Sequence, residues 1–94
     1  MPDCFEMACQ KIAIEISDLI IKKQHDYGHN NILDFGELGL IVRVNDKVAR
    51  LKNLIGKEAQ NESKADTWMD IAGYAIIALM LERGWFQLEL SDND

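Results

Sequence analysis

A stripe of charged side chains follows one predicted helix. Its members stand at i, i+3, i+4 and i+7 and are Arg43, Asp46, Lys47 and Arg50. Residues at these spacings share one side of a helix. The three cations could therefore bind phosphate groups together. The alternative is a solvated helix face on which Asp46 pairs with Arg50.

A line of acidic residues enters the most hydrophobic segment of the chain. It consists, at i, i+4 and i+8, of Glu62, Asp66 and Asp70, and Gly73 continues the same face. Asp70 is flanked by apolar residues, and a carboxylate is expensive to bury there unless it is paired or bound to a metal. Two structural alternatives stand beside a metal site. Asp66 could form a capping box with Ser63, and Asp70 could form a salt bridge with Arg43 or Arg50.

The segment that precedes the charged stripe of residues 43–50 combines lysines, an aromatic residue and a glycine. It contains Lys22, Lys23, Asp26, Tyr27, Gly28 and His29. Lys23 and Tyr27 suit a phosphate and a stacked base. The lysines could instead satisfy the negative end of a helix dipole, and Tyr27 could simply pack.

Three helices must position these residues. Apolar residues at helical spacing predict helices at about residues 3–25, 37–55 and 62–83, with a loop around residues 25–31. The first has a capping-box-like start at Asp3 and Glu6, and the third is apolar nearly all round, which predicts that it is the central helix. Residues 85–94 predict a short strand or an extended arm, with the last four residues disordered. The expected fold is all-α, a small bundle in one domain over residues 1–94.

Composition narrows the function. A net charge of −6 disfavours duplex nucleic acid as a partner, because duplex binding relies on Lys and Arg at phosphates. The longest apolar run, residues 71–81, is too short to span a membrane. Cys4 and Cys9 stand on different helix faces and predict no bridge, and no signal peptide is recognisable, so a cytoplasmic location is expected. The short chain and its many apolar residues predict a homo-oligomer, a dimer or larger.

These residues resemble a known family. The succession from Lys23 and Asp26-Tyr27-Gly28, through Gly39 and the charged stripe, to Asp66-Thr67, Asp70 and Gly73-Tyr74 is similar to the nucleotide modification associated domain family of phages and bacteria. That family looks like a branch of the MazG-like all-α nucleoside triphosphate pyrophosphohydrolases. The resemblance covers about residues 20–82. It implies a MazG-like bundle that handles nucleotides in a bacterial or phage-infected cell.

The resemblance also implies site residues. MazG-like enzymes hold Mg²⁺ with an E-x-x-E pair on one helix and an E-x-x-D pair on a later one. These pairs fall here on Arg43-x-x-Asp46 and Thr67-x-x-Asp70, so only Asp46 and Asp70 match as carboxylates. Asp66 could replace one lost ligand. Asp46, Asp66 and Asp70 are thus the expected Mg²⁺ ligands, brought together across a cleft, with Asp46 and Asp70 catalytic.

Two functions follow as expectations, with a third as the structural alternative. The first is a Mg²⁺-dependent nucleotide pyrophosphohydrolase, in which phosphate and base are bound by the cations and the tyrosine, namely Lys23, Tyr27, Arg43, Lys47 and Arg50. The second is a module that binds a nucleotide without hydrolysing it, and the missing glutamates favour it, because three carboxylates make a two-metal site hard to assemble. The third is a structural oligomerisation domain, which fully solvated charged stripes would favour.

Overall fold

Four helices account for most of residues 1–91, the part of the chain that this computed structural model describes. They are α1 (Phe5–Tyr27), α2 (Asn30–Leu33), α3 (Gly36–Asn53) and α4 (Lys64–Glu82). No strand occurs in the described residues, so the prediction of an all-α fold is confirmed. None of these helices is both long and apolar enough to cross a membrane.

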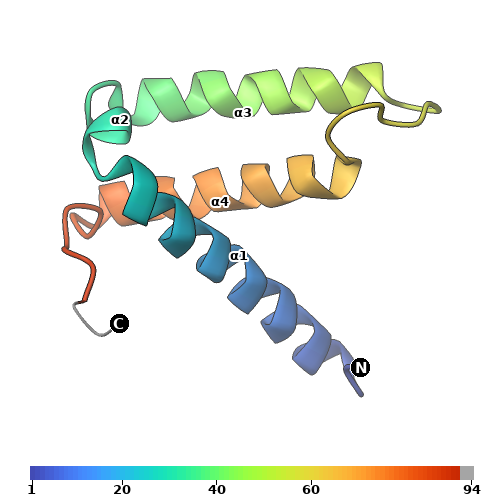
Figure 1. The fold of residues 1–94 in the computed structure, drawn as a ribbon, viewed down its shortest axis with the longest axis horizontal. Helices are drawn as coiled ribbons and strands as arrows, with labels where there is room; N and C mark the ends of the chain where they lie inside the picture. The colour runs from blue at the N-terminus through green and yellow to red at the C-terminus, as the bar shows by residue number, and fades with distance from the viewer. Residues whose placement is uncertain (92–94) are drawn as a thin grey trace.

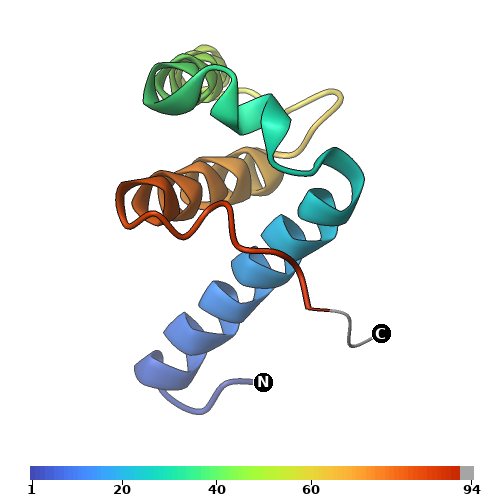
Figure 2. The same cartoon turned by 90° about the vertical axis from the view of Figure 1, so that its left-hand side faces the viewer.

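The helices form an open arrangement around α4. α3 and α4 lie side by side, and α1 crosses α4 obliquely and then runs away from it (Figure 1). Figure 2, turned by 90°, shows the same divergence of the N-terminal part of α1. α4 packs against both long neighbours and is the central helix, as its composition predicts. Its outer side is uncovered, however, and Trp68 there is 61% exposed.

The start of α1 differs from the prediction. Cys4 is the N-cap residue and makes no side-chain capping hydrogen bond, so the capping box of Asp3 and Glu6 is not formed. The helix continues past residue 25 and ends at Tyr27. Gly28 stops it with a φ of 66°, a conformation that favours glycine.

The predicted loop between the first two helices contains a short helix, α2. Its four residues are too few to show a hydrophobic period, and for this reason the sequence did not predict it.

The start of α4 is closer to expectation. Ser63 is the N-cap, and its Oγ accepts a hydrogen bond from the Asp66 N–H at 3.0 Å. This bond is one half of the predicted capping box.

The buried core lies near α2 and the C-terminal ends of α1 and α4. Ile32, Leu40 and Phe86 are its buried apolar side chains, and partly buried neighbours surround them, namely Tyr74, Ile77, Ala78, Met80 and Leu81. Residues 85–91 contain no strand, whereas an extended arm that packs on a neighbour stays a prediction. They turn back onto their own chain. The Phe86 ring packs edge-on against the His29 ring, with 5.6 Å between the two ring centroids. Disorder was predicted for residues 91–94, and of these residues 92–94 lie outside the described part of the chain.

Candidate functional site

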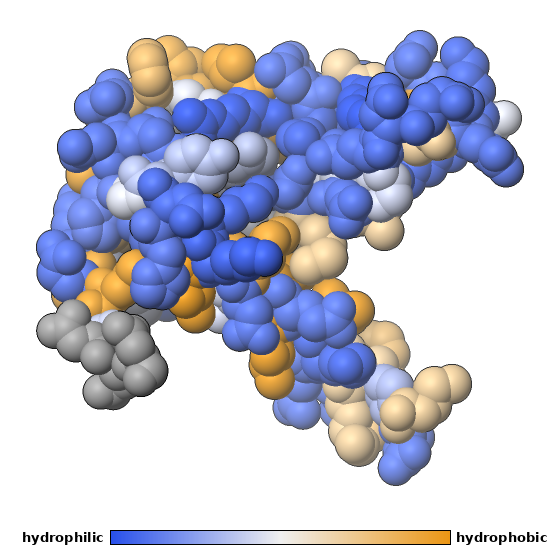
Figure 3. All heavy atoms as spheres, viewed as in Figure 1, coloured by the Kyte–Doolittle hydropathy of each residue, from blue (hydrophilic) through white to orange (hydrophobic). Residues whose placement is uncertain are grey.

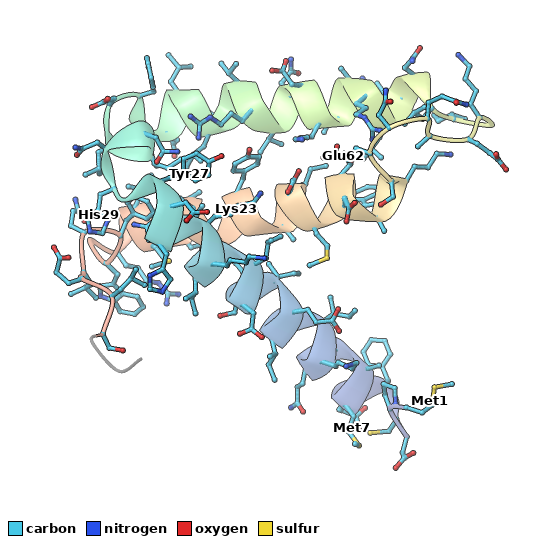
Figure 4. All side chains as sticks on the ribbon, in the orientation of Figure 1. Met1, Met7, Lys23, Tyr27, His29 and Glu62 are labelled. Atoms are coloured by element: carbon cyan, nitrogen blue, oxygen red, sulfur yellow. The ribbon has the colours of Figure 1, made fainter. Side chains whose placement is uncertain are left out.

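The candidate site is a cavity of about 280 Å³ between α1, α3 and α4. Its polar lining includes Lys23 and Tyr27 of α1, Arg43 of α3 and Asp70 of α4. Apolar side chains, Gln24 and Tyr74 form the remaining walls, with Asn31 at the α2 end. Figure 4 shows Lys23 and Tyr27 on the C-terminal part of α1, the part that crosses α4. Three of the five predicted nucleotide-binding residues, Lys23, Tyr27 and Arg43, therefore line one cavity.

Asp70 joins the three long helices electrostatically. Its Oδ2 lies 3.0 Å from Lys47 Nζ of α3, and its Oδ1 lies 3.3 Å from Lys23 Nζ of α1. The Asp70 side chain is only 12% exposed, so this pairing offsets much of the cost of burying a carboxylate. The sequence predicted a paired or metal-bound Asp70. Its partners are the two lysines and not Arg43 or Arg50, the partners considered from sequence.

The same contact stabilises the charged form of Lys47. The hydrogen bond to Asp70 raises the pKa of Lys47 above its ordinary value of 10.5, and the negative charges of Asp70 and Glu62 act in the same direction. Partial burial opposes this shift but does not cancel it. Lys47 is a cation at neutral pH, and its ion pair with Asp70 joins α3 to α4.

Arg50 is engaged by the start of α4. Its Nη1 donates to Thr67 Oγ1 at 2.6 Å, and its Nη2 donates to the Glu62 carbonyl oxygen. Thr67 is fully buried, and its hydroxyl donates to Glu62 Oε2 at 3.0 Å. Figure 4 shows Glu62 at this end of α4, away from Tyr27. Arg50 thus fixes the connection between α3 and α4, and it does not line the cavity.

The predicted carboxylate set is not brought together. Asp46 and Asp66 are both exposed, and residues 1–91 contain no group of three His, Cys, Asp or Glu side chains that could hold a metal ion. Consecutive residues on a helix are about 100° apart. Because Lys47 points inward to Asp70, Asp46 is turned outward. The charged stripe therefore includes side chains that point toward α4 and side chains that point away from it.

This arrangement bears on Mg²⁺. A hard dication needs several oxygen ligands, and Asp70 is the carboxylate that the described part of the chain places in the cavity. Both of its oxygens already face ammonium groups. The donor set within one chain therefore does not fit a magnesium site made by Asp46, Asp66 and Asp70. A cationic site for an anionic ligand fits it better.

Two groups at the cavity were not predicted from sequence. Asn31 Oδ1 is buried and accepts no hydrogen bond from residues 1–91, although the Asn31 carbonyl accepts one from Arg43 Nη2 at 3.3 Å. Tyr74 lies one helical turn after Asp70 on α4 and lines the same wall. Tyr74 could have been found from its i+4 spacing to Asp70. Asn31 could not, because its position depends on α2.

The comparisons with known proteins identify a family for this chain. No curated protein and no solved structure matches the chain. The sequence profile of a family described as nucleotide modification associated domain 1 matches residues 23–81, which is more than half of the chain and includes Lys23, Arg43, Lys47 and Asp70. The relationship to MazG-like enzymes stays a prediction. The chain belongs to the nucleotide modification associated domain 1 family.

Proposed function

We propose that this protein binds a nucleotide in the cavity between α1, α3 and α4. One observation carries the proposal. In a chain with a net charge of −6, three of its ten Lys and Arg residues converge on one cavity: Lys23 and Arg43 line it, and Lys47 reaches the Asp70 that lines it. Such a local excess of positive charge in an acidic protein favours an anionic ligand.

The phosphate groups would lie among these three cations. Arg43 donates one hydrogen bond to a carbonyl, which leaves most of its five N–H donors for phosphate oxygens. Lys23 and Lys47 each have three donors and share the Asp70 carboxylate, and Lys47 Nζ also lies 3.6 Å from Glu62 Oε2. A phosphate would therefore compete with Asp70 for two lysines that are already in position.

The base would lie toward the α2 end of the cavity. Tyr27 and Tyr74 offer aromatic surface, and the neighbouring walls are aliphatic. The unpartnered Asn31 Oδ1 offers an acceptor for an N–H group of a base. Binding would then satisfy a buried oxygen that accepts no hydrogen bond from residues 1–91.

Binding without hydrolysis, as in a module that sequesters or senses a nucleotide, is the function that this geometry supports best. The cavity presents one carboxylate, and that carboxylate is paired with two lysines. Mg²⁺-dependent pyrophosphate release is the alternative, and the same experiment tests it. A purely structural role is disfavoured, because the stripe is not fully solvated: the Lys47 and Arg50 side chains are 25% and 27% exposed.

The test is calorimetric titration with a panel of nucleoside triphosphates and monophosphates, with and without Mg²⁺, while pyrophosphate release is assayed in parallel. Lys23→Ala should weaken binding about tenfold, because one charge-assisted contact is lost at a half-exposed lysine. Lys22→Ala is the matched control: Lys22 is adjacent and exposed but does not line the cavity. Equal effects of both changes, or no binding by the wild type, would contradict the proposal. Rapid Mg²⁺-dependent pyrophosphate release would favour the alternative.

A further inference from the structure

The N-terminal half of α1 extends from the body of the protein, and no element within residues 1–91 covers it (Figures 1 and 2). α1 has 23 residues and none of them is buried. Phe5 is 81% exposed and Ile12 is 53% exposed, although both are large and apolar. A helical segment of about three turns that packs against nothing is marginal in water. Some other surface is needed to stabilise this half of the helix.

The dimensions of the chain lead to the same conclusion. Its accessible surface is 7372 Å², whereas a compact folded monomer of 10.7 kDa exposes about 5,500 Å². Its radius of gyration is 14.9 Å, against about 12 Å for a compact domain of this length. The excess surface is about 1,900 Å², which exceeds the ~800 Å² that each partner buries in a standard protein interface. A single chain therefore exposes more surface than a compact monomer does, and the excess area is large enough to form a dimer interface.

The apolar stripe of α1 has a symmetric spacing. Its members are Phe5, Ala8, Ile12, Ile16 and Leu19, separated by 3, 4, 4 and 3 residues. This order reads the same in both directions from Ile12. The Leu19 end lies at the cavity beside α4, whereas the Phe5 end runs beyond the cover of α4. Figure 3 shows hydrophobic surface on the inner side of the angle between α4 and this part of α1.

We propose that a second copy of this chain covers the stripe, with the two α1 helices antiparallel about a twofold axis at Ile12. In that arrangement Phe5 of one copy faces Leu19 of the other, Ala8 faces Ile16, and the two Ile12 side chains meet. A twofold interface must be complementary to itself, and a stripe with symmetric spacing fulfils this requirement in the antiparallel direction. The stripe would pair like the seam of an antiparallel coiled coil.

The opposite side of α1 does not share this pattern. Met7, Ile14 and Ile21 are spaced seven residues apart there and are interrupted by polar residues, namely Gln10, Lys11, Ser17 and Asp18. Ile14 is 61% exposed, close to the value for Ile12. The two isoleucines therefore lie on different faces of α1, but their exposed fractions are similar. They form a matched pair for mutagenesis.

The first test is the mass of the full chain by light scattering coupled to size exclusion at micromolar concentration, without ligand. The wild type should have twice 10.7 kDa. Ile12→Glu should raise the dissociation constant of the dimer at least about 100-fold, because it buries two like charges at the twofold axis. Ile14→Glu should leave the dimer intact. A wild-type monomer, or a dimer lost with Ile14→Glu and kept with Ile12→Glu, would overturn the proposal.

A second test does not depend on the folding of a charged variant. Cys4 and Cys9 are replaced by serine, and Ile12→Cys or Ile14→Cys is added. Mild oxidation should link Ile12→Cys chains into a disulfide dimer, because only residues at the axis bring two Cα atoms within the distance that a disulfide requires. Ile14→Cys should stay unlinked. The reverse result, or no link in either variant, would overturn the α1 interface. Both tests are made without nucleotide, so they succeed or fail independently of the proposed function.

Discussion

Lys47 of α3 and Asp70 of α4 form an ion pair of 3.0 Å across the two helices that lie side by side. Asp70 shares its second oxygen with Lys23 of α1, so one carboxylate links three helices. The residues that hold the helices together are thus the residues proposed to meet the phosphate. Ligand binding and fold stability should therefore respond to the same substitutions, often in opposite directions.

Asp70→Asn should show this opposition. Removing the charge leaves two lysines without their counter-ion, and the free energy of unfolding should fall by about 1–2 kcal/mol, because the lysines are partly solvated. Affinity for a nucleoside triphosphate should rise, since Asp70 no longer competes for the lysines. Urea unfolding and calorimetry measure the two effects.

Asp46→Asn is the control for this substitution. Asp46 is exposed and should change stability by less than about 0.5 kcal/mol. If Asp70 were a Mg²⁺ ligand instead, Asp70→Asn would abolish Mg²⁺-dependent nucleotide binding. Loss of affinity in Asp70→Asn would therefore count against the arrangement proposed above.

The pH dependence of the free energy of unfolding should reflect the titration of Lys47. Its pKa in the folded chain is raised above 10.5, so the folded state holds the proton more tightly than the unfolded state. This contribution is complete below pH 10.5 and is lost as the pH rises through the pKa of the folded state. Stability should therefore decrease on the alkaline side, and Lys47→Met should show a smaller decrease. Urea unfolding of both proteins over this range is the measurement, and equal slopes would contradict the assignment.

Much of the fold was predictable because the signals are local. Periodic apolar residues located the three long helices to within a few residues, since a buried helix face repeats every three to four positions. α2 was missed because Asn30–Leu33 spans only about one such repeat, which is too short to show a period. The burial of Phe86 was missed for a different reason. It depends on where the chain turns after α4, and residues 85–91 have no period that reveals this turn.

The sequence predicted which residues belong to the site better than it predicted which of these residues form ion pairs with each other. Lys23, Arg43 and Asp70 were identified by charge and spacing, and the structure places all three at one cavity. Which cation meets Asp70 depends on where α1 and α3 lie along α4, and no local pattern encodes this. For the same reason, the sequence could not show that Lys47 faces inward while Asp46 faces outward.

Thr67 offers a matched pair for the connection between α3 and α4. Thr67→Val removes the hydroxyl that accepts from Arg50 and donates to Glu62, and this should lower the free energy of unfolding by about 1–3 kcal/mol. Thr67→Ser keeps the hydroxyl and should cost only about 1 kcal/mol, for the lost methyl group. Denaturant unfolding distinguishes the two. A Thr67→Val protein as stable as the wild type would show that this network contributes little.

The central claim is that the cations at the cavity bind the phosphates of a nucleotide. Its most direct measurement compares the affinity of the wild-type protein for a nucleoside triphosphate and for the matching nucleoside, each at low and at high salt. The triphosphate should bind more tightly, and its affinity should fall as salt screens the charges of Lys23, Arg43 and Lys47. The nucleoside should bind weakly, with little dependence on salt. Equal affinities for the two ligands, unchanged by salt, would contradict the claim.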